Sequence, residues 1–299
     1  VLFGGSIPAT TAITEEYNRS TNVITAAAWA SGGDVNTPGS FRGGAGTQTA
    51  GLIMGGNPTP SPPTMINATE EYNGASWTSV NNMVQARNAM GTFGIQTAAA
   101  AFGGNYPTPA NRTTYVEEYD GTNWTAVTAY PVGAETIGGT GTQTAGLAAG
   151  GYSTTSLTTT NEYDGSSWTG SGAMTTARTA FGKSTAGTQT ASLVYGGGVI
   201  NAESYNGTGW TAVPSLPTSV ANNAGAGTQD AALSFGGYTT TTVATTFAYD
   251  GTAWSTSPSM ATTRIQFPGF GTDTAAMAVS GATPGATAAT EEFTGETSA

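Results

Sequence analysis

Pairs of neighbouring glutamates are the residues in this sequence whose type and spacing could do chemistry. They stand at Glu15-Glu16, Glu70-Glu71, Glu117-Glu118 and Glu291-Glu292. Two convergent carboxylates can carry out acid–base catalysis or hold calcium. Neighbours on a strand, however, point to opposite faces of the sheet, so such a pair does not converge. We therefore expect a structural role, in which one glutamate of each pair binds an arginine and the other meets water.

Histidine and cysteine are both absent from the 299 residues. Their absence removes the most common general base and the main ligands of zinc and copper. Lys183 is the only lysine, which leaves little for lyase chemistry that uses Lys or His. We therefore expect no enzymatic activity, no cofactor and no metal site.

The charge balance limits the classes of partner. The chain has 7 basic and 18 acidic residues, and its net charge is −11. Such a surface disfavours nucleic acid and anionic membranes, both of which attract basic patches. Since no run approaches 18 apolar residues, we also expect no membrane insertion.

The glutamates belong to a unit that the sequence repeats seven times. Each copy places a Gly-Gly pair, a Thr-rich stretch of variable length, an aromatic residue, an Asn-Gly or Asp-Gly turn and a tryptophan in that order. The first copy has Gly4-Gly5 and Tyr17, and the last has Gly281 and Phe293. Successive aromatics lie 42 to 55 residues apart, a period typical of one supersecondary unit stacked on its own copies. The repeat spans the whole chain, which predicts a single domain over residues 1–299. We assign a structural role to the repeated residues Gly55, Gly56, Tyr72, Trp77, Gly103, Gly104, Tyr119, Trp124, Tyr163, Trp168, Tyr205, Trp210, Tyr249 and Trp254.

One copy predicts four antiparallel strands. In the fifth copy we expect them at residues 176–181, 190–195, 202–205 and 210–213, with a hairpin turn at Asn206-Gly207. Units that are apolar on both faces must be covered on both, and stacking them around an axis gives an all-β propeller. Strands two and three occur seven times, whereas strands one and four occur six times. We expect seven blades with two strands missing or supplied by a neighbouring chain, in preference to six blades with an overhang.

The order of residues resembles the kelch repeat. Leu193-Val194-Tyr195-Gly196-Gly197, then Tyr205 and Trp210, match that motif, and so does an arginine that opens the next unit at Arg42, Arg87, Arg178 and Arg264. The consensus of the copies, G-T-Q-T-A-A-L-x-F-G-G followed by T-E-E-Y-D-G-T-S-W-T, also resembles kelch-like arrays in structural proteins of marine tailed phages and in marine bacteria. The resemblance implies a kelch-like β-propeller in which the arginine is structural. Two copies depart from it, because Glu135 and Ser219 lie where the arginine is missing. The first copy lacks its tryptophan near Ile24, and Trp29 is the candidate to replace it.

The loops between Gly-Gly and the third strand differ most between copies and lie on one face of the propeller. They cover residues 57–69, 105–116, 152–161, 198–201 and 238–247. Variation on one face of a repeat fold favours binding there. The candidate binding residues are Tyr106, Arg112, Tyr115, Tyr152 and Tyr238, against the alternative of inert solvated loops. A repeated glutamine beside the first hairpin, with Asp273 in the last copy, is interpreted as turn structure rather than as channel lining.

These features favour a structural or binding protein over an enzyme. The resemblance implies a virion component, such as a tail fibre, an appendage or a capsid-surface protein. Its partners would be other virion or surface proteins, a host glycan or a receptor, and an oligomer is compatible with the repeat. The alternative is a secreted or cell-surface bacterial protein for adhesion or glycan binding. Either one implies a location in the virion or outside the cell.

Overall fold

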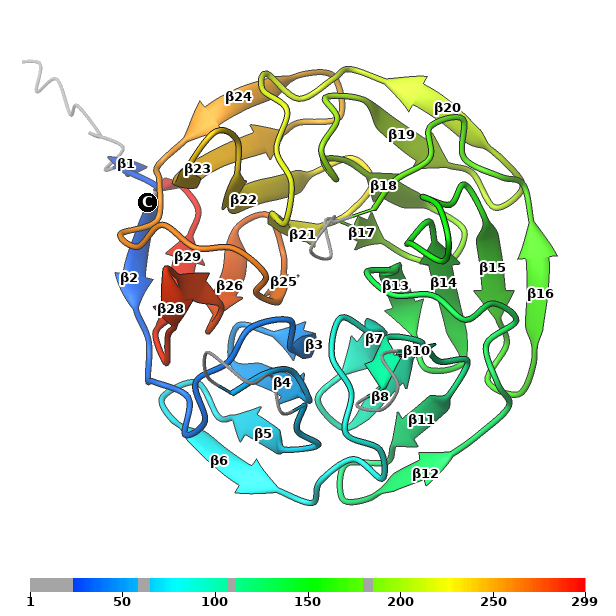
Figure 1. The fold of residues 1–299 in the computed structure, drawn as a ribbon. Coiled ribbons are helices and arrows are strands. Elements are labelled where there is room, and N and C mark those ends of the chain that lie inside the picture. Colours follow the sequence, from blue (N-terminus) through cyan, green and yellow to red (C-terminus); the bar gives the residue numbers. More distant parts are fainter. Residues whose placement is uncertain (1–23, 59–64, 107–110, 180–184, 299) are drawn as a thin grey trace, which may run out of the picture.

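Six four-stranded antiparallel sheets stand around a central channel like the blades of a propeller (Figure 1). The computed structural model describes residues 24–58, 65–106, 111–179 and 185–298. Within these ranges every regular element is a strand. The all-β propeller predicted from the sequence is therefore confirmed.

Each blade runs from an inner strand at the channel to an outer strand at the rim. Blade I contains β3 (Gly43–Thr47), β4 (Ala50–Met54), β5 (Thr69–Tyr72) and β6 (Trp77–Val80), and blade II contains β7 (Gly91–Ile95), β8 (Ala98–Phe102), β11 (Val116–Tyr119) and β12 (Trp124–Ala126). Blade III contains β13 (Gly138–Thr142), β14 (Ala145–Ala149), β15 (Thr160–Tyr163) and β16 (Trp168–Ser171), and blade IV contains β17 (Thr185–Gly187), β18 (Ser192–Val194), β19 (Ala202–Tyr205) and β20 (Trp210–Val213). Blade V contains β21 (Ala224–Gly227), β22 (Ala232–Tyr238), β23 (Thr242–Tyr249) and β24 (Trp254–Ser257), and blade VI contains β25 (Gly269–Gly271), β26 (Ala275–Val279), β29 (Thr290–Thr294) and β2 (Ala28–Ser31). Three short two-stranded ladders join β1 (Ile24–Thr25) to β30 (Thr297–Ser298), β9 (Asn105–Tyr106) to β10 (Asn111–Arg112), and β27 (Ala282–Thr283) to β28 (Gly285–Ala286).

Blade VI is assembled from both ends of the described chain. Its outer strand β2 pairs with β29, and Trp29 lies opposite Phe293. The preference for seven blades was therefore wrong. The tryptophan strand of the first copy completes the blade of the last copy, because all copies share one register. The ring of described residues closes without a neighbouring chain. The first copy's Gly4-Gly5, Glu15-Glu16 and Tyr17 lie outside the described residues.

The strand bounds expected from the fifth copy are largely right. Strands three and four match β19 and β20, and β18 lies inside the expected second strand. The expected first strand is wrong, since Arg178 precedes the blade and β17 begins at Thr185. Phe181 lies outside the described residues. In blade V the expected loop 238–247 is also wrong, because a register shift between Phe235 and Gly237 lets β22 and β23 continue past the glycines.

Small residues let neighbouring blades pack closely against each other. Gly51 of blade I faces the aromatic ring of Phe270 in blade VI, and a β-carbon on Gly51 would lie 2.9 Å from two of that ring's carbons. Such a distance is below van der Waals contact, so only glycine fits at this position. The abundance of glycine therefore serves packing between blades as well as turns.

A ring of backbone hydrogen bonds joins equivalent residues that precede the inner strands. The amides of Phe41, Ala89 and Thr136 donate to the carbonyls of Gln266, Phe41 and Ala89, at 2.7, 3.0 and 2.6 Å. Each of these residues has a positive φ between 50° and 58°. Non-glycine residues adopt this conformation at a cost, and the bonds to neighbouring blades help to hold it.

In most blades the repeated tyrosine, the repeated tryptophan or both make a hydrogen bond to the preceding blade. Their rings pack within the blade, as in the Tyr119–Trp124 pair with centroids 5.1 Å apart. The Trp124 indole N–H then donates to Thr69 Oγ1 at 3.1 Å, and the Tyr119 hydroxyl donates to Glu71 Oε1 at 2.8 Å, both in blade I. Equivalent Tyr–Glu bonds join Tyr163 to Glu118, Tyr205 to Glu162 and Tyr72 to Glu292.

The expectation that the other glutamate of each pair meets water was therefore incomplete. This second glutamate is partly exposed, but its carboxylate also accepts a phenol from the next blade. At the junction of blades IV and V, Ser204 replaces the glutamate, and the Tyr249 hydroxyl donates to the carbonyl of Gly251 at 3.0 Å. At the junction of blades V and VI, the carboxylate and the hydroxyl are both lost: Ala248 stands in the place of the glutamate, and Phe293 stands in the place of the tyrosine that would reach it. This matched loss leaves no phenol unpaired at that junction.

These buried phenols predict a loss of stability at alkaline pH. Burial, followed by the hydrogen bond to Glu292, raises the pKa of Tyr72 to about 12, and burial with Glu162 does the same for Tyr205. A pKa raised in the folded state stabilises the fold fully below the unfolded value near 10. We expect stability to decline as the pH rises from about 10 to 12, because the folded phenols resist ionisation there. Chemical denaturation at stepped pH, with ultraviolet titration of the tyrosines, measures this. A Tyr72→Phe variant should show a shallower decline, and an equally steep one would contradict the assignment.

The repeated glutamine also joins blades. The Gln96 side-chain amide donates to the carbonyls of Gly51 and Tyr72 in blade I, at 3.0 and 2.7 Å. Gln48, Gln143, Gln189 and Gln229 make the equivalent pair of bonds. The interpretation as turn structure was thus incomplete, because the side chain binds the neighbouring blade rather than its own turn.

Asp273 occupies the glutamine position at the junction of blades V and VI. A carboxylate has no N–H to donate, so it cannot bind the equivalent carbonyls of Ala232 and Tyr249. We expect Asp273→Gln to add both bonds and raise the free energy of unfolding by about 1–2 kcal/mol. Thermal unfolding measures the gain. Asp273→Ala removes the charge without adding a donor, and an equal gain in that variant would show that the hydrogen bonds are not the cause.

A buried ion pair anchors four of the six blades, and in three of them it uses one glutamate of a Glu-Glu pair, as expected. Guanidinium and carboxylate lie 2.5 to 3.1 Å apart, and neither side chain is more than 4% exposed. The pairs are Arg42–Glu70, Arg87–Glu117, Arg178–Glu203 and Arg264–Glu291. Each guanidinium also donates to backbone carbonyls, as Arg87 does to Gly103 and Tyr115 at 2.9 and 2.7 Å.

Candidate binding face

Four of the five candidate residues gather between blades II and III, on the face formed by the loops after Gly-Gly. The short β9–β10 ladder of blade II carries Tyr106 and Arg112, with Asn105 opposite Arg112. Tyr115 precedes β11. Tyr152 belongs to blade III and pairs through its backbone with Glu135, at 2.9 and 3.0 Å.

Arg112 connects the two blades. Its Nε and Nη2 lie 2.9 and 2.8 Å from Glu135 Oε1, and its guanidinium carbon lies 4.5 Å from the ring centre of Tyr152. Asn105 donates its side-chain amide to the other oxygen of the same carboxylate. The Arg112 and Glu135 side chains are 31% and 20% exposed, so the pair contributes at most about 1 kcal/mol. Its main effect is to fix the direction of Arg112 and Tyr152.

A hollow of about 250 Å³ lies beside this cluster. It is lined by Gln85, Tyr106, Arg112, Thr113 and Tyr115. The Tyr106 side chain is 39% exposed. The guanidinium of Arg87 lies 5.4 Å from the ring centre of Tyr115, and burial raises the pKa of that phenol. Phenols, an amide and one cation can hydrogen-bond and stack against a polar ligand, but this lining contains no carboxylate beside a nucleophile.

Tyr238 does not belong to this cluster. It ends β22 in blade V, pairs with Thr242 and is 45% exposed. Sequence reasoning also missed Gln85, Thr113 and Glu135 as members of the site. In the sequence, Glu135 stands out only because it lies where the repeated arginine is missing.

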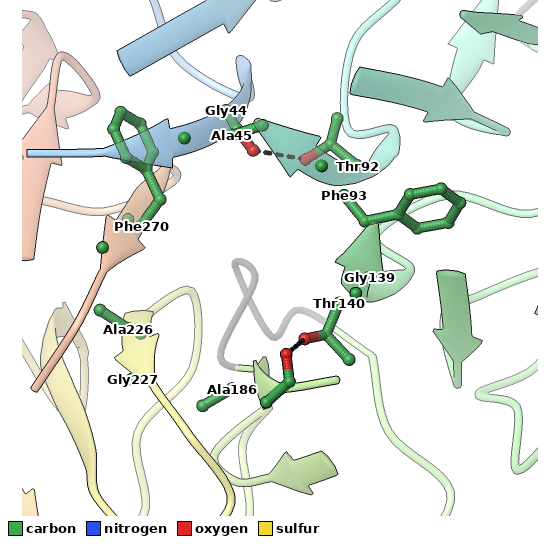
Figure 2. A pocket seen from close by; sticks show the side chains of 17 residues that line it. Gly44, Ala45, Thr92, Phe93, Gly139, Thr140, Ala186, Ala226, Gly227 and Phe270 are labelled. Atoms are coloured by element: carbon green, nitrogen blue, oxygen red, sulfur yellow. Dashed lines mark hydrogen bonds between the residues drawn. The ribbon is translucent and has the colours of Figure 1, made fainter. Parts of the chain in front are cut away.

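The central channel is a second cavity, of about 140 Å³, formed by the inner strands of all six blades (Figure 2). None of its 17 lining residues has an ionisable side chain. The hydroxyls of Thr92 and Thr140 donate to the carbonyls of Gly44 and Gly187, at 2.7 and 2.6 Å. The channel therefore presents mainly backbone and small apolar groups.

Nowhere among the described residues do three Asp, Glu, His or Cys side chains come together in a way that could hold a metal ion. No helix in these ranges is long and apolar enough to cross a membrane.

The fold and this face define a six-bladed β-propeller with four-stranded blades and one face of unequal loops. No protein-family model matches the sequence, and no curated protein is similar to it.

Proposed function

We propose that this propeller is a non-enzymatic kelch-type structural and binding module of a virion, in which the loop face contacts a host surface or another virion protein. The observation that carries the proposal is the gathering of Tyr106, Arg112 and Tyr115 around one hollow on the variable face, with Tyr152 packed against Arg112 beside it. The repeated Gly-Gly, Tyr and Trp in the blades support the kelch assignment. The resemblance of the repeat consensus to phage arrays supports the assignment to a virion.

The mechanism is passive. Blade-to-blade bonds make the ring stiff, so the loops are held in place before a partner arrives and little ordering is required on binding. Phenols and a guanidinium suit polar partners such as glycans. Each contact of this size is weak, and many copies on one particle supply avidity.

Binding to host cells tests the contact. The full chain, displayed in many copies on beads, should bind cells or a glycan array, and Arg112→Ala should reduce that binding several-fold. Tyr238→Ala is the matched control, because it changes an exposed aromatic residue on the same face but in blade V. Equal binding by both variants and the parent chain would contradict the assignment of the binding site to the face between blades II and III.

The source of the chain tests the virion assignment separately. Mass spectrometry of purified phage particles should find the chain as a particle component. Its presence on bacterial cells and absence from particles would favour the alternative of a bacterial adhesion protein.

A further inference from the structure

In three of the four ion-paired blades, a backbone hydrogen bond marks the position of the arginine. The carbonyls of Arg87, Arg178 and Arg264 each accept an N–H from a repeated glycine, at 2.8 to 3.0 Å. At blades III and V, the carbonyls of Ala134 and Val220 accept the equivalent glycine N–H, at 2.7 and 2.9 Å. These two residues therefore replace the arginine.

The carboxylate is replaced in the same two blades. The residue two before the repeated tyrosine is glutamate in the four ion-paired blades, but it is Asn161 in blade III and Phe247 in blade V. Because both charges are lost together, neither blade is left with a lone buried charge.

Blade III fills the vacated space. Tyr130 is 1% exposed, its hydroxyl accepts the Asn161 amide at 3.1 Å, and its ring packs against Phe102 and Trp168 with centroids 5.5 and 4.8 Å away. In blade V the residue equivalent to Tyr130 is Leu216, which is shorter and lacks a hydroxyl.

Blade V leaves a pocket in this place, with a volume of about 220 Å³. Val220, Val243 and Phe247 supply apolar walls, and Thr218, Thr239 and Thr245 supply hydroxyls. Within the described ranges, these three hydroxyls make no hydrogen bond with other protein groups. None of the lining residues is charged.

We propose that this pocket binds one ring of a neutral sugar. The volume corresponds to about seven waters and lies below the roughly 300 Å³ of drug-sized pockets, so a single ring fits. A sugar ring has apolar C–H faces, which suit Phe247 and the valines. Its hydroxyls both donate and accept, as do those of threonine. The absence of a cation in the pocket and the net charge of −11 disfavour acidic sugars.

Saturation-transfer NMR on the full chain tests the site with glucose, galactose, mannose, fucose and N-acetylglucosamine as probes. At least one should bind in the millimolar range, at about −4 kcal/mol. The double variant Val220→Arg/Phe247→Glu rebuilds the ion pair of the other blades and should weaken binding at least tenfold. Thr245→Val keeps the shape of the pocket, removes one hydroxyl and should weaken sugar binding several-fold. This variant tests the pocket even if the double variant fails to fold.

Ile95→Ala is the control, because it changes an exposed apolar residue that lines neither this pocket nor the hollow between blades II and III, and it should leave the sugar affinity unchanged. Two results would overturn the proposal: no signal from any of the five sugars at concentrations of about 10 mM, well above the expected dissociation constant, or binding that Thr245→Val leaves intact. This site does not depend on the virion role, since loss of cell binding by Arg112→Ala and loss of sugar binding by Thr245→Val are independent readouts.

Discussion

Replacing Arg87 with methionine should lower the free energy of unfolding by about 3–5 kcal/mol, because it leaves Glu117 as a buried carboxylate without its partner. Both side chains are fully buried, and their charged atoms lie 3.1 Å apart. Burial lowers the pKa of Arg87, whereas Glu117 opposes that change, so each group depends on the other. The carbonyls of Gly103 and Tyr115 lose donors as well. Equilibrium unfolding in urea, followed by tryptophan fluorescence, measures the loss.

The matched control comes from blade V. Arg87→Val combined with Glu117→Phe reproduces the pair Val220 and Phe247, which that blade tolerates. The double variant should recover much of the stability that the single variant loses, because no buried charge is left alone. A double variant as unstable as the sum of its two single variants would show that the charges are not coupled.

Trp29→Ala should destabilise the ring by about 3 kcal/mol and loosen blade VI before any other blade. Trp29 lies in the strand that closes the ring, and its ring packs 5.0 Å from that of Phe235 in blade V and 5.2 Å from that of Phe293. Its indole N–H donates to Thr246 at 3.2 Å. Hydrogen exchange should show the amides of β26 and β29 losing protection first.

Trp254→Ala is the control for this prediction. Trp254 also lies in an outer strand, but its indole N–H donates to the carbonyl of Pro214, and continuous chain joins all four strands of blade V. Its removal should lower stability without exposing one blade selectively. Equal exchange across all blades in Trp29→Ala would contradict the role of β2 as the closing strand.

The blade architecture could be predicted from the sequence because it depends on local patterns. Ala202–Tyr205 and Trp210–Val213 are separated by a turn whose Asn206 side chain accepts the amides of Thr208 and Gly209, and such signals lie within a few residues. The arginine–glutamate pairs could be predicted because both members recur in most copies.

The number of blades and the bonds between them could not be predicted in this way. Each copy of the unit is compatible with any neighbour, so the sequence does not state that Trp29 pairs with Phe293. The bond from Tyr119 to Glu71 joins residues 48 positions apart in different blades, and neither residue indicates the other. Part of the residue cluster between blades II and III could be predicted, because Tyr106 and Arg112 lie in a variable stretch. Glu135, which orients Arg112, carries no such signal.

The two ends of the closing blade lie at the same edge of the ring, and this determines how the molecule responds to mechanical tension. Ile24 pairs with Ser298, and farther in Ala28 pairs with Thr294 and Ser31 with Glu291. A pull on residues 24 and 298 therefore loads these antiparallel pairs one after another, as in peeling, rather than all together in shear. We expect the ring to open from blade VI at low force, while the other five blades keep their strands.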